Sequence, residues 1–153
     1  MSKSTLKDKW VMITGASSGF GAAAARAFGV EGSKLLLGAR RVDRLKTVAA
    51  EARAAGAPEA HFHLLDVART DSVEAFVLWA RGIIANGQSP IANRQSPSPR
   101  LDVLINNAGG AHGLDTVAAG KDEDWEAMMQ SNVLGVLRMT RAALPLMLDN
   151  PGS

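Results

Sequence analysis

The sequence of 153 residues predicts an α/β fold built on a doubly wound parallel sheet. Three observations predict this fold: short apolar runs recur along the chain, helical patterns separate them, and a glycine-rich turn joins the first run to the first helix. Runs that are apolar almost throughout are typical of parallel strands covered on both faces. Right-handed β-α-β connections between such strands give one sheet with helices on both sides.

Four apolar runs are expected to form the strands, over residues 10–14, 34–38, 61–66 and 102–106. The third run, His-Phe-His-Leu-Leu-Asp, alternates between apolar and polar residues more than the others, which favours a place at an edge of the sheet. The expected spatial order is three, two, one, four, which leaves the outer edge of the fourth strand unpaired.

Helical patterns fill the intervals between the strands, over residues 19–30, 42–55 and from Ser72 to about residue 84. Gly56 is expected to cap the second of these helices, and Asp43 to lie in its first turn. Each strand is therefore followed by a helix, as the doubly wound arrangement requires.

A last, long helix is predicted from Asp122 to Leu148, opened by the acidic turn Asp-Glu-Asp-Trp-Glu. Pro145 should kink or end it. Five residues are expected to share one apolar face of this helix: Trp125, Met128, Met129, Asn132 and Val136. A buried amide must find hydrogen-bond partners, so Asn132 on that face is expected to be buried and bonded.

A single domain is expected over residues 1–153, with one surface insertion. The interval between the third and fourth strands is the longest, and its excess lies in residues 86–100, which hold three of the six prolines and a repeated Gln-Ser-Pro. Such a composition predicts a flexible segment, with a short interaction loop as the alternative.

Composition excludes several classes of partner. The net charge is only +2 and the basic residues are scattered, which argues against nucleic-acid binding. No apolar run approaches the roughly 18 residues of a membrane span, and the lysines near the start are not followed by the apolar region of a secretory signal. The chain has no cysteine, which fits a cytoplasmic protein.

The glycine-rich turn, residues 14–21, indicates a dinucleotide site. Gly15 permits a tight turn, the bare loop lets backbone N–H groups approach a pyrophosphate at a helix N-terminus, and Gly21 permits close helix packing. Ser17 and Ser18 add hydroxyl donors. The alternative is a tight turn without a ligand, whereas a P-loop is excluded because no Gly-Lys-Ser/Thr follows.

Further motifs make the chain resemble the short-chain dehydrogenase/reductase family, classical type. That family has Thr-Gly and further glycines at this spacing, an Asp-Val pair closing the third strand, Asn-Asn-Ala-Gly after the fourth, and Ser/Thr-Asn-Val-x-Gly on the long helix. Here Asp66-Val67, residues 106–109 and residues 131–135 stand in those places. The resemblance covers residues 8 to about 150 and implies a Rossmann-type sheet.

The resemblance implies hydride transfer between a nicotinamide cofactor and a carbonyl or alcohol carbon of a small molecule, by a protein that is homo-oligomeric when complete. It assigns Asp66 and Val67 to the adenine, Asn107, Ala108 and Gly109 to the ribose and nicotinamide side, and Asn132 to a proton relay. The alternative for the asparagines is turn formation, which is compatible with binding. The predicted cofactor-binding residues are Gly15, Ser17, Ser18, Gly19, Phe20, Gly21, Arg40, Arg41, Asp66, Val67, Asn107, Ala108 and Gly109, with Asn132 catalytic.

Arg40 and Arg41 predict NADP(H) rather than NAD(H). They follow the second strand, where an acid commonly bonds the ribose hydroxyls of NAD. An acid there would repel a 2′-phosphate, whereas a guanidinium bonds it with charge-assisted geometry. The alternative is that both arginines are solvated ahead of the next helix.

The other catalytic side chains of the family have no counterpart here. The family uses a serine, a tyrosine and a lysine four residues after the tyrosine, all beyond the long helix. This sequence has no tyrosine, residues 133–153 contain no lysine, and Ser153 is the last residue. Hydride transfer to a carbonyl needs a proton donor within reach. The expectation is therefore a cofactor-binding part, truncated after the fourth strand and the long helix and inactive alone.

Two alternatives to an oxidoreductase remain: a non-catalytic NADP-binding module, or an unstable truncated gene product. Within the family, the segments GARRVDRL and DWEAMMQSNVLGVLRMTRAALPLM are similar to the subgroup acting on small 3-hydroxy acids, serine included. His61 and His63 form a His-x-His pair, but without a third ligand nearby no metal site is expected. His112 follows the Asn-Asn-Ala-Gly turn and could approach the substrate.

Overall fold

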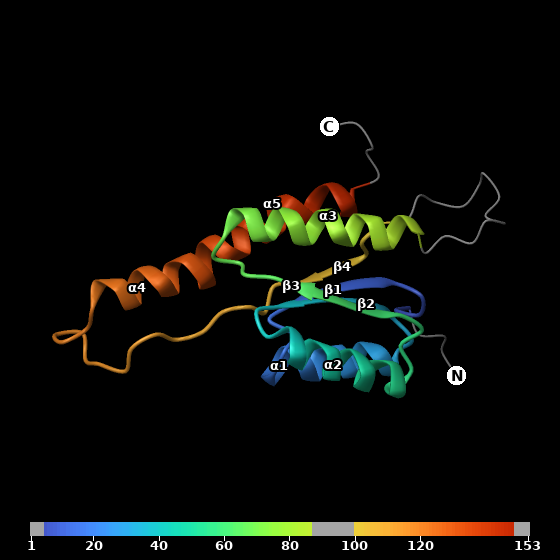
Figure 1. Cartoon of the computed structure of the whole chain (residues 1–153), viewed down its shortest axis with the longest axis horizontal. Helices are drawn as coiled ribbons and strands as arrows, with labels where there is room; N and C mark the ends of the chain where they lie inside the picture. The colour runs from blue at the N-terminus through green and yellow to red at the C-terminus, as the bar shows by residue number, and fades with distance from the viewer. Residues whose placement is uncertain (1–4, 87–99, 149–153) are drawn as a thin grey trace.

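The computed structural model describes residues 5–86 and 100–148, which form three layers (Figure 1). A parallel sheet lies between one pair of helices on each face. The strands are β1 (Trp10–Thr14), β2 (Lys34–Ala39), β3 (Ala60–Leu64) and β4 (Val103–Ile105). The helices are α1 (Gly19–Val30), α2 (Val42–Ala55), α3 (Thr70–Asn86), α4 (Asp122–Met128), the π-helical segment η1 (Met129–Leu134) and α5 (Gly135–Met147).

The sheet has the order β3-β2-β1-β4 with every pair parallel, which confirms the predicted order and the edge position of the third strand. In its register Met12 pairs with both Leu36 and Leu104. Two strands are shorter than predicted at the end that faces the site: β3 ends at Leu64 and β4 at Ile105. Leu65 still donates its N–H to the Ala39 carbonyl, and beyond Leu65 and Ile105 the backbone forms loops.

Alternating residues of the central strands build two separate cores. Val11, Ile13 and Leu37 face α1 and α2, whereas Met12 and Leu36 face α3 and α5. All five side chains are fully buried, and burying a side chain of this size stabilises a fold by about 1.5–3 kcal/mol. The sheet that carries the loops is therefore rigid on both faces.

The first three helices agree with the sequence pattern except at one start. Asp43 lies in the first turn of α2, and Gly56 caps its end with a φ of 130°. Helix α3 begins at Thr70, two residues before the predicted start, because the carbonyl of Arg69 already accepts the Val73 N–H.

The long helix is present but is not one regular α-helix. The run from Asp122 to Met147 contains η1 in its middle, and Pro145 lies within its last turn. The expectation of a buried apolar face was wrong at three of its residues, since Trp125 and Met129 are 41% and 54% exposed and Asn132 is exposed. A π segment adds a residue to the turn and shifts the register, and α4 projects beyond the sheet (Figure 1).

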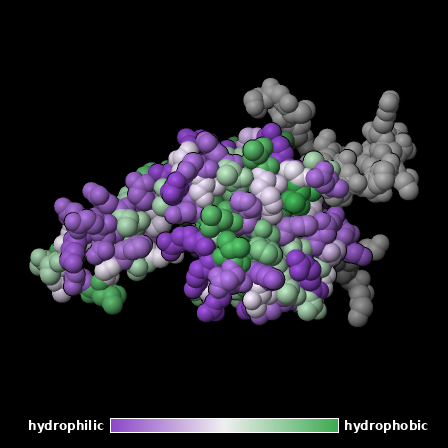
Figure 2. Space-filling view, viewed as in Figure 1, coloured by the Kyte–Doolittle hydropathy of each residue, from purple (hydrophilic) through white to green (hydrophobic). Residues whose placement is uncertain are grey.

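Figure 2 shows that this projecting part is largely hydrophilic with an apolar tip. The loop that leads into α4 carries Leu114 and Val117, both almost completely exposed. The predicted insertion at 86–100 lies, apart from its two end residues, outside the described residues. In the two described stretches, no helix is both long and apolar enough to cross a membrane.

Candidate functional site

A cleft of about 320 Å³ lies at the carboxyl end of the sheet. Its walls come from the loop after β1 and the start of α1, the end of β2 and the two residues after it, and the loops after β3 and β4, together with η1. Ligands of open α/β sheets bind at this edge. All the predicted cofactor residues line the cleft except Gly19 and Gly21. The sequence reasoning missed four lining residues: Ala39, Leu65, Gly110 and Ser131.

The glycine loop needs its glycines for two different reasons. Gly15 and Gly19 have φ values of 66° and 55°, a region that other residues rarely adopt. Gly21 has no such angle, but a Cβ there would lie 2.5 Å from the Gly15 carbonyl oxygen and 2.6 Å from Asn107 Nδ2. The absence of a side chain at Gly21 therefore leaves room for the Gly15 carbonyl and the Asn107 amide. The expectation was close packing of the helix on a strand, and the structure identifies the groups that come close.

Thr14 joins the glycine loop to the loop after β4. Its buried Oγ1 accepts the N–H groups of Asn107 at 3.0 Å and Ala108 at 2.9 Å. In return Asn107 Nδ2 donates to the carbonyl oxygens of Thr14 at 3.0 Å and Gly15 at 3.3 Å. Two walls of the cleft are thus fixed to each other, and the Asn107 amide does more than form a local turn.

Arg41 extends from the start of α2 across the glycine loop. Its Nη2 donates to Ser17 Oγ at 3.1 Å and to Ser18 Oγ at 2.6 Å. Arg40 is exposed on the cleft wall and makes no hydrogen bond or ion pair within the described residues. The alternative that both arginines are merely solvated therefore does not fit Arg41, whose guanidinium is held beside two hydroxyls.

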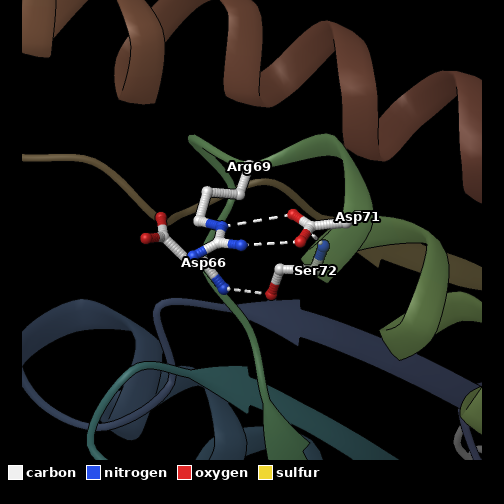
Figure 3. Close-up of polar contacts among 4 residues, drawn as sticks. All are labelled: Asp66, Arg69, Asp71 and Ser72. Atoms are coloured by element: carbon white, nitrogen blue, oxygen red, sulfur yellow. Dashed lines mark hydrogen bonds and ion pairs between the residues drawn. The ribbon is translucent and has the colours of Figure 1, made fainter.

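Asp66 lies in the turn between β3 and α3 (Figure 3). Its Oδ1 accepts the Ala68 N–H at 3.0 Å, and its own N–H donates to Ser72 Oγ at 2.9 Å. Beside it, Arg69 and Asp71 form an exposed ion pair with N–O distances of 3.2 and 2.6 Å. That hydrogen bonding raises the pKa of Arg69 and lowers the pKa of Asp71.

Asn132 projects from η1 towards the loop after β4. Its Oδ1 accepts the Gly110 N–H at 2.8 Å and its Nδ2 donates to the Gly110 carbonyl at 2.9 Å. The predicted hydrogen bonding is therefore present although the predicted burial is not. Asn132 does not line the cleft, but its neighbour Ser131 does. A Cβ on Gly109 would collide with Asn132 Oδ1, so this loop fits the asparagine closely.

The three histidines occupy separate places. His61 Nε2 lies 3.0 Å from Glu59 Oε2, and His63 stacks on Trp79 with ring centroids 5.2 Å apart. His112 lines the cleft. Across residues 5–86 and 100–148 no group of three His, Cys, Asp or Glu side chains could hold a metal ion.

Comparison with known proteins gives consistent relationships. The sequence model of the family described as short chain dehydrogenase matches residues 9–153. The chain is 35% identical over 139 residues to the sulfoacetaldehyde reductase of Chromohalobacter salexigens, covering 91% of this chain and 49% of the relative. It is 34% identical over 144 residues to the serine 3-dehydrogenase of Agrobacterium fabrum, covering 93% and 50%. The chain thus spans about half the length of these curated relatives.

Solved structures show the same fold. An alcohol dehydrogenase from Thermococcus sibiricus, complexed with 5-hydroxy-NADP, has a TM-score of 0.76 at 34% identity, over 92% of this chain and 54% of that one. A short chain dehydrogenase/reductase from Burkholderia phymatum, in complex with NAD, has a TM-score of 0.77 at 30% identity, over 97% and 46%. Both known structures contain a nicotinamide dinucleotide.

Proposed function

Because the chain belongs to the short-chain dehydrogenase family, we propose that it binds NADP(H) in the cleft and forms the cofactor-binding part of an oxidoreductase. The bound cofactor supplies or accepts a hydride, and the partner is a carbonyl or alcohol carbon of a small molecule. The observation that carries the choice of cofactor is Arg41, whose guanidinium is bonded to Ser17 and Ser18 at the cleft wall.

The charge of Arg41 suits a 2′-phosphate. Within the described residues no carboxylate pairs with it, and its hydrogen-bond partners are two neutral hydroxyls. An unneutralised guanidinium beside hydroxyl donors binds a phosphate through short, charge-assisted hydrogen bonds. Arg40, exposed on the same wall, adds a second positive charge. The bare loop at the start of α1 provides the backbone donors for the pyrophosphate.

Asp66 and Val67 have the groups that an adenine edge requires. Adenine presents an amino donor beside a ring-nitrogen acceptor. Asp66 has a carboxylate oxygen, and Val67 a backbone N–H, that take part in no hydrogen bond within the described residues. A carboxylate accepts and a peptide N–H donates, so the pair complements that edge.

Asn107, Ala108 and Gly109 would lie along the ribose and nicotinamide side of the cofactor. Thr14 holds the first two in place, and Asn132 holds the adjoining Gly110. The proposed role of Asn132 is to support a proton relay beside the nicotinamide. The chain has no tyrosine, so its cleft offers no phenol to exchange a proton with a substrate oxygen.

We therefore expect the 153-residue protein alone to bind NADPH without oxidising it in the presence of carbonyl compounds. Small 3-hydroxy acids are the proposed substrates of the complete protein, since a serine 3-dehydrogenase is among its relatives. A homo-oligomer in the cytoplasm is the proposed setting. A non-catalytic NADP-binding module is the second candidate, favoured by the missing tyrosine. If the purified chain oxidised NADPH in the presence of a panel of carbonyl compounds, the inactivity expected for both candidates would be contradicted.

The cofactor choice is tested by titrating the chain with NADPH and NADH, following nicotinamide fluorescence. Arg41→Ala should weaken NADPH binding by roughly 10- to 100-fold, since a charged hydrogen bond contributes about 1.5–3 kcal/mol, and should leave NADH nearly unchanged. Arg44→Ala, an exposed arginine of α2 outside the cleft wall, is the matched control. Absence of NADPH binding by the parent would overturn the proposal, and equal losses for both cofactors would overturn the phosphate assignment.

A further inference from the structure

Asp66 lies two residues past the end of the edge strand β3, and its backbone N–H donates to a side chain and not to the neighbouring strand. Leu65, one residue earlier, donates its N–H inward to the Ala39 carbonyl at 3.1 Å. Successive N–H groups of an extended strand point to opposite sides, and among the described residues no strand lies beyond β3. The outward N–H of Asp66 therefore needs an acceptor from elsewhere. Ser72, in the first turn of α3, supplies it through Oγ at 2.9 Å (Figure 3).

This bond completes a set that fixes Asp66. Its carbonyl accepts the Arg69 N–H at 3.1 Å, and its Oδ1 accepts the Ala68 N–H at 3.0 Å. With the Ser72 contact, the N–H, the carbonyl and one carboxylate oxygen of Asp66 are all bonded. Within the described residues only the second carboxylate oxygen has no hydrogen bond. The turn thus holds one acceptor ready on a residue of the cleft wall.

We propose that Ser72 is a positioning residue for base recognition: its hydroxyl sets the backbone of Asp66 so that the free carboxylate oxygen meets the amino group of the adenine. The inference rests on the proposed NADP(H) site. Ser72 itself does not line the cleft, so it acts through Asp66. A carboxylate held in one orientation accepts from a 6-amino group and rejects a 6-oxo group, which has no donor to offer.

The neighbouring ion pair does not have this role. Arg69 and Asp71 side chains are 66% and 68% exposed, and their hydrogen bonds are to each other and to the Ser72 backbone. Neither side chain forms a hydrogen bond to Asp66. The contact from Ser72 is half-buried and lies on the chain path from β3 to α3, so its loss changes the direction of Asp66.

The competing explanation is that Ser72 only helps α3 to begin. The two roles differ in what they do to base selectivity, because a looser helix start weakens binding of every dinucleotide alike. The test compares NADPH with nicotinamide hypoxanthine dinucleotide phosphate, reduced form, in which a 6-oxo group replaces the 6-amino group. The parent chain, Ser72→Ala, Ser72→Thr and Thr70→Ala are each titrated with both compounds, with thermal unfolding recorded alongside.

The parent should prefer the adenine compound, and Ser72→Ala should narrow that preference by roughly three- to tenfold, the value of one hydrogen bond. Ser72→Thr keeps the hydroxyl and should restore the parent ratio. Thr70→Ala removes a hydroxyl from the same turn that makes no hydrogen bond within the described residues, and should leave the ratio unchanged. Ser72→Cys, close to serine in size but a weak acceptor, should also narrow the preference.

An unchanged ratio in Ser72→Ala and Ser72→Cys, or equal losses for both compounds, would overturn this inference and leave the proposed function standing. Equal binding of NADPH and its hypoxanthine analogue by the parent chain would also overturn this inference and leave the proposed function standing. A parent that binds neither compound would overturn the proposed function, and this inference with it.

Discussion

Asn132 and Gly110 are joined by two hydrogen bonds that use both polar atoms of the Asn132 side-chain amide and both the backbone N–H and the carbonyl of Gly110. Oδ1 accepts the Gly110 N–H at 2.8 Å, and Nδ2 donates to the Gly110 carbonyl at 2.9 Å. The pair connects the π-helical middle of the long helix to the loop that follows β4. Thr14 holds the near end of the same loop through Ala108, so the loop is anchored at two places.

Asn132→Ala should lower the free energy of unfolding by about 1–2 kcal/mol, because two exposed hydrogen bonds are lost. Asn132→Asp should cost at least as much, since it keeps the acceptor for the Gly110 N–H but places a carboxylate oxygen, which only accepts, against the Gly110 carbonyl in place of the Nδ2 donor. Urea denaturation followed by tryptophan fluorescence measures both. A clearly smaller loss in the aspartate variant than in the alanine variant would contradict the assignment of Nδ2 as the donor to the Gly110 carbonyl.

Replacing Gly21 with alanine should destabilise the fold by about 1–3 kcal/mol and abolish NADPH binding, because the new methyl group would meet the Gly15 carbonyl at 2.5 Å. Gly82→Ala is the matched control. Among the described residues, no atom outside its own stretch of helix lies within 4 Å of its added Cβ, and it lies inside α3, so alanine there should stabilise by about 0.5–1 kcal/mol. Thermal unfolding of the two variants should therefore shift in opposite directions.

Thr14→Val should lower the free energy of unfolding by about 2–4 kcal/mol, since it leaves two backbone N–H groups without their acceptor in a buried place. The change keeps the side-chain shape and removes only the hydroxyl. Thr14→Ser keeps the hydroxyl and should retain most of the stability and the NADPH affinity. A larger loss in Thr14→Ser than in Thr14→Val would point to packing of the methyl group instead of the hydroxyl.

The ion pairs of Glu59 with Lys34 and His61 predict that the free energy of unfolding depends on pH in the acid range. Partial burial raises the pKa of Glu59, but hydrogen bonds from Lys34 and His61 outweigh it and hold the pKa below the ordinary 4.5. A carboxyl whose pKa is lower in the folded state stabilises above its unfolded value and loses that effect as the pH falls through the folded value.

At pH 7 the free energy of unfolding of the parent should therefore be higher than that of Glu59→Gln. The difference should be less than about 1 kcal/mol, because solvent screens the pair. The difference should decline as the pH falls below 4.5 and then disappear. Chemical denaturation at a series of pH values measures it, and a difference that persists in strong acid would contradict the proposed charge effect.

The strand order and the glycine loop could be predicted because local patterns determine them. Successive side chains of a strand point to opposite faces, which places Val11 and Met12 in opposite cores. Gly15 and Gly19 have positive φ angles, which glycine adopts far more readily than other residues. Arg41 could be assigned to the cleft from its place after β2, but its bonds to Ser17 and Ser18 follow from the tertiary fold.

Other features depend on contacts that the sequence pattern does not contain. The proposed role of Ser72 depends on the N–H of Asp66, which lies two residues past the edge strand β3 and donates to the Ser72 hydroxyl. The exposure of Trp125 and Met129 arises because a periodicity of 3.6 residues does not hold through η1. Asn132 was correctly expected to be bonded, but a helical-face argument could not supply its partner Gly110.

The π segment also makes the long helix sensitive to length. Residues 129–134 hold an extra residue compared with an α-helix, and each residue of an α-helix turns the chain by about 100°. Removing any one of them would let a regular helix form while rotating Asn132 and α4 relative to Met139 and Ala143 in the core. In this stretch the number of residues matters as well as the identity of Asn132, so a sequence alignment that lost one position here would misplace every residue on one side of it.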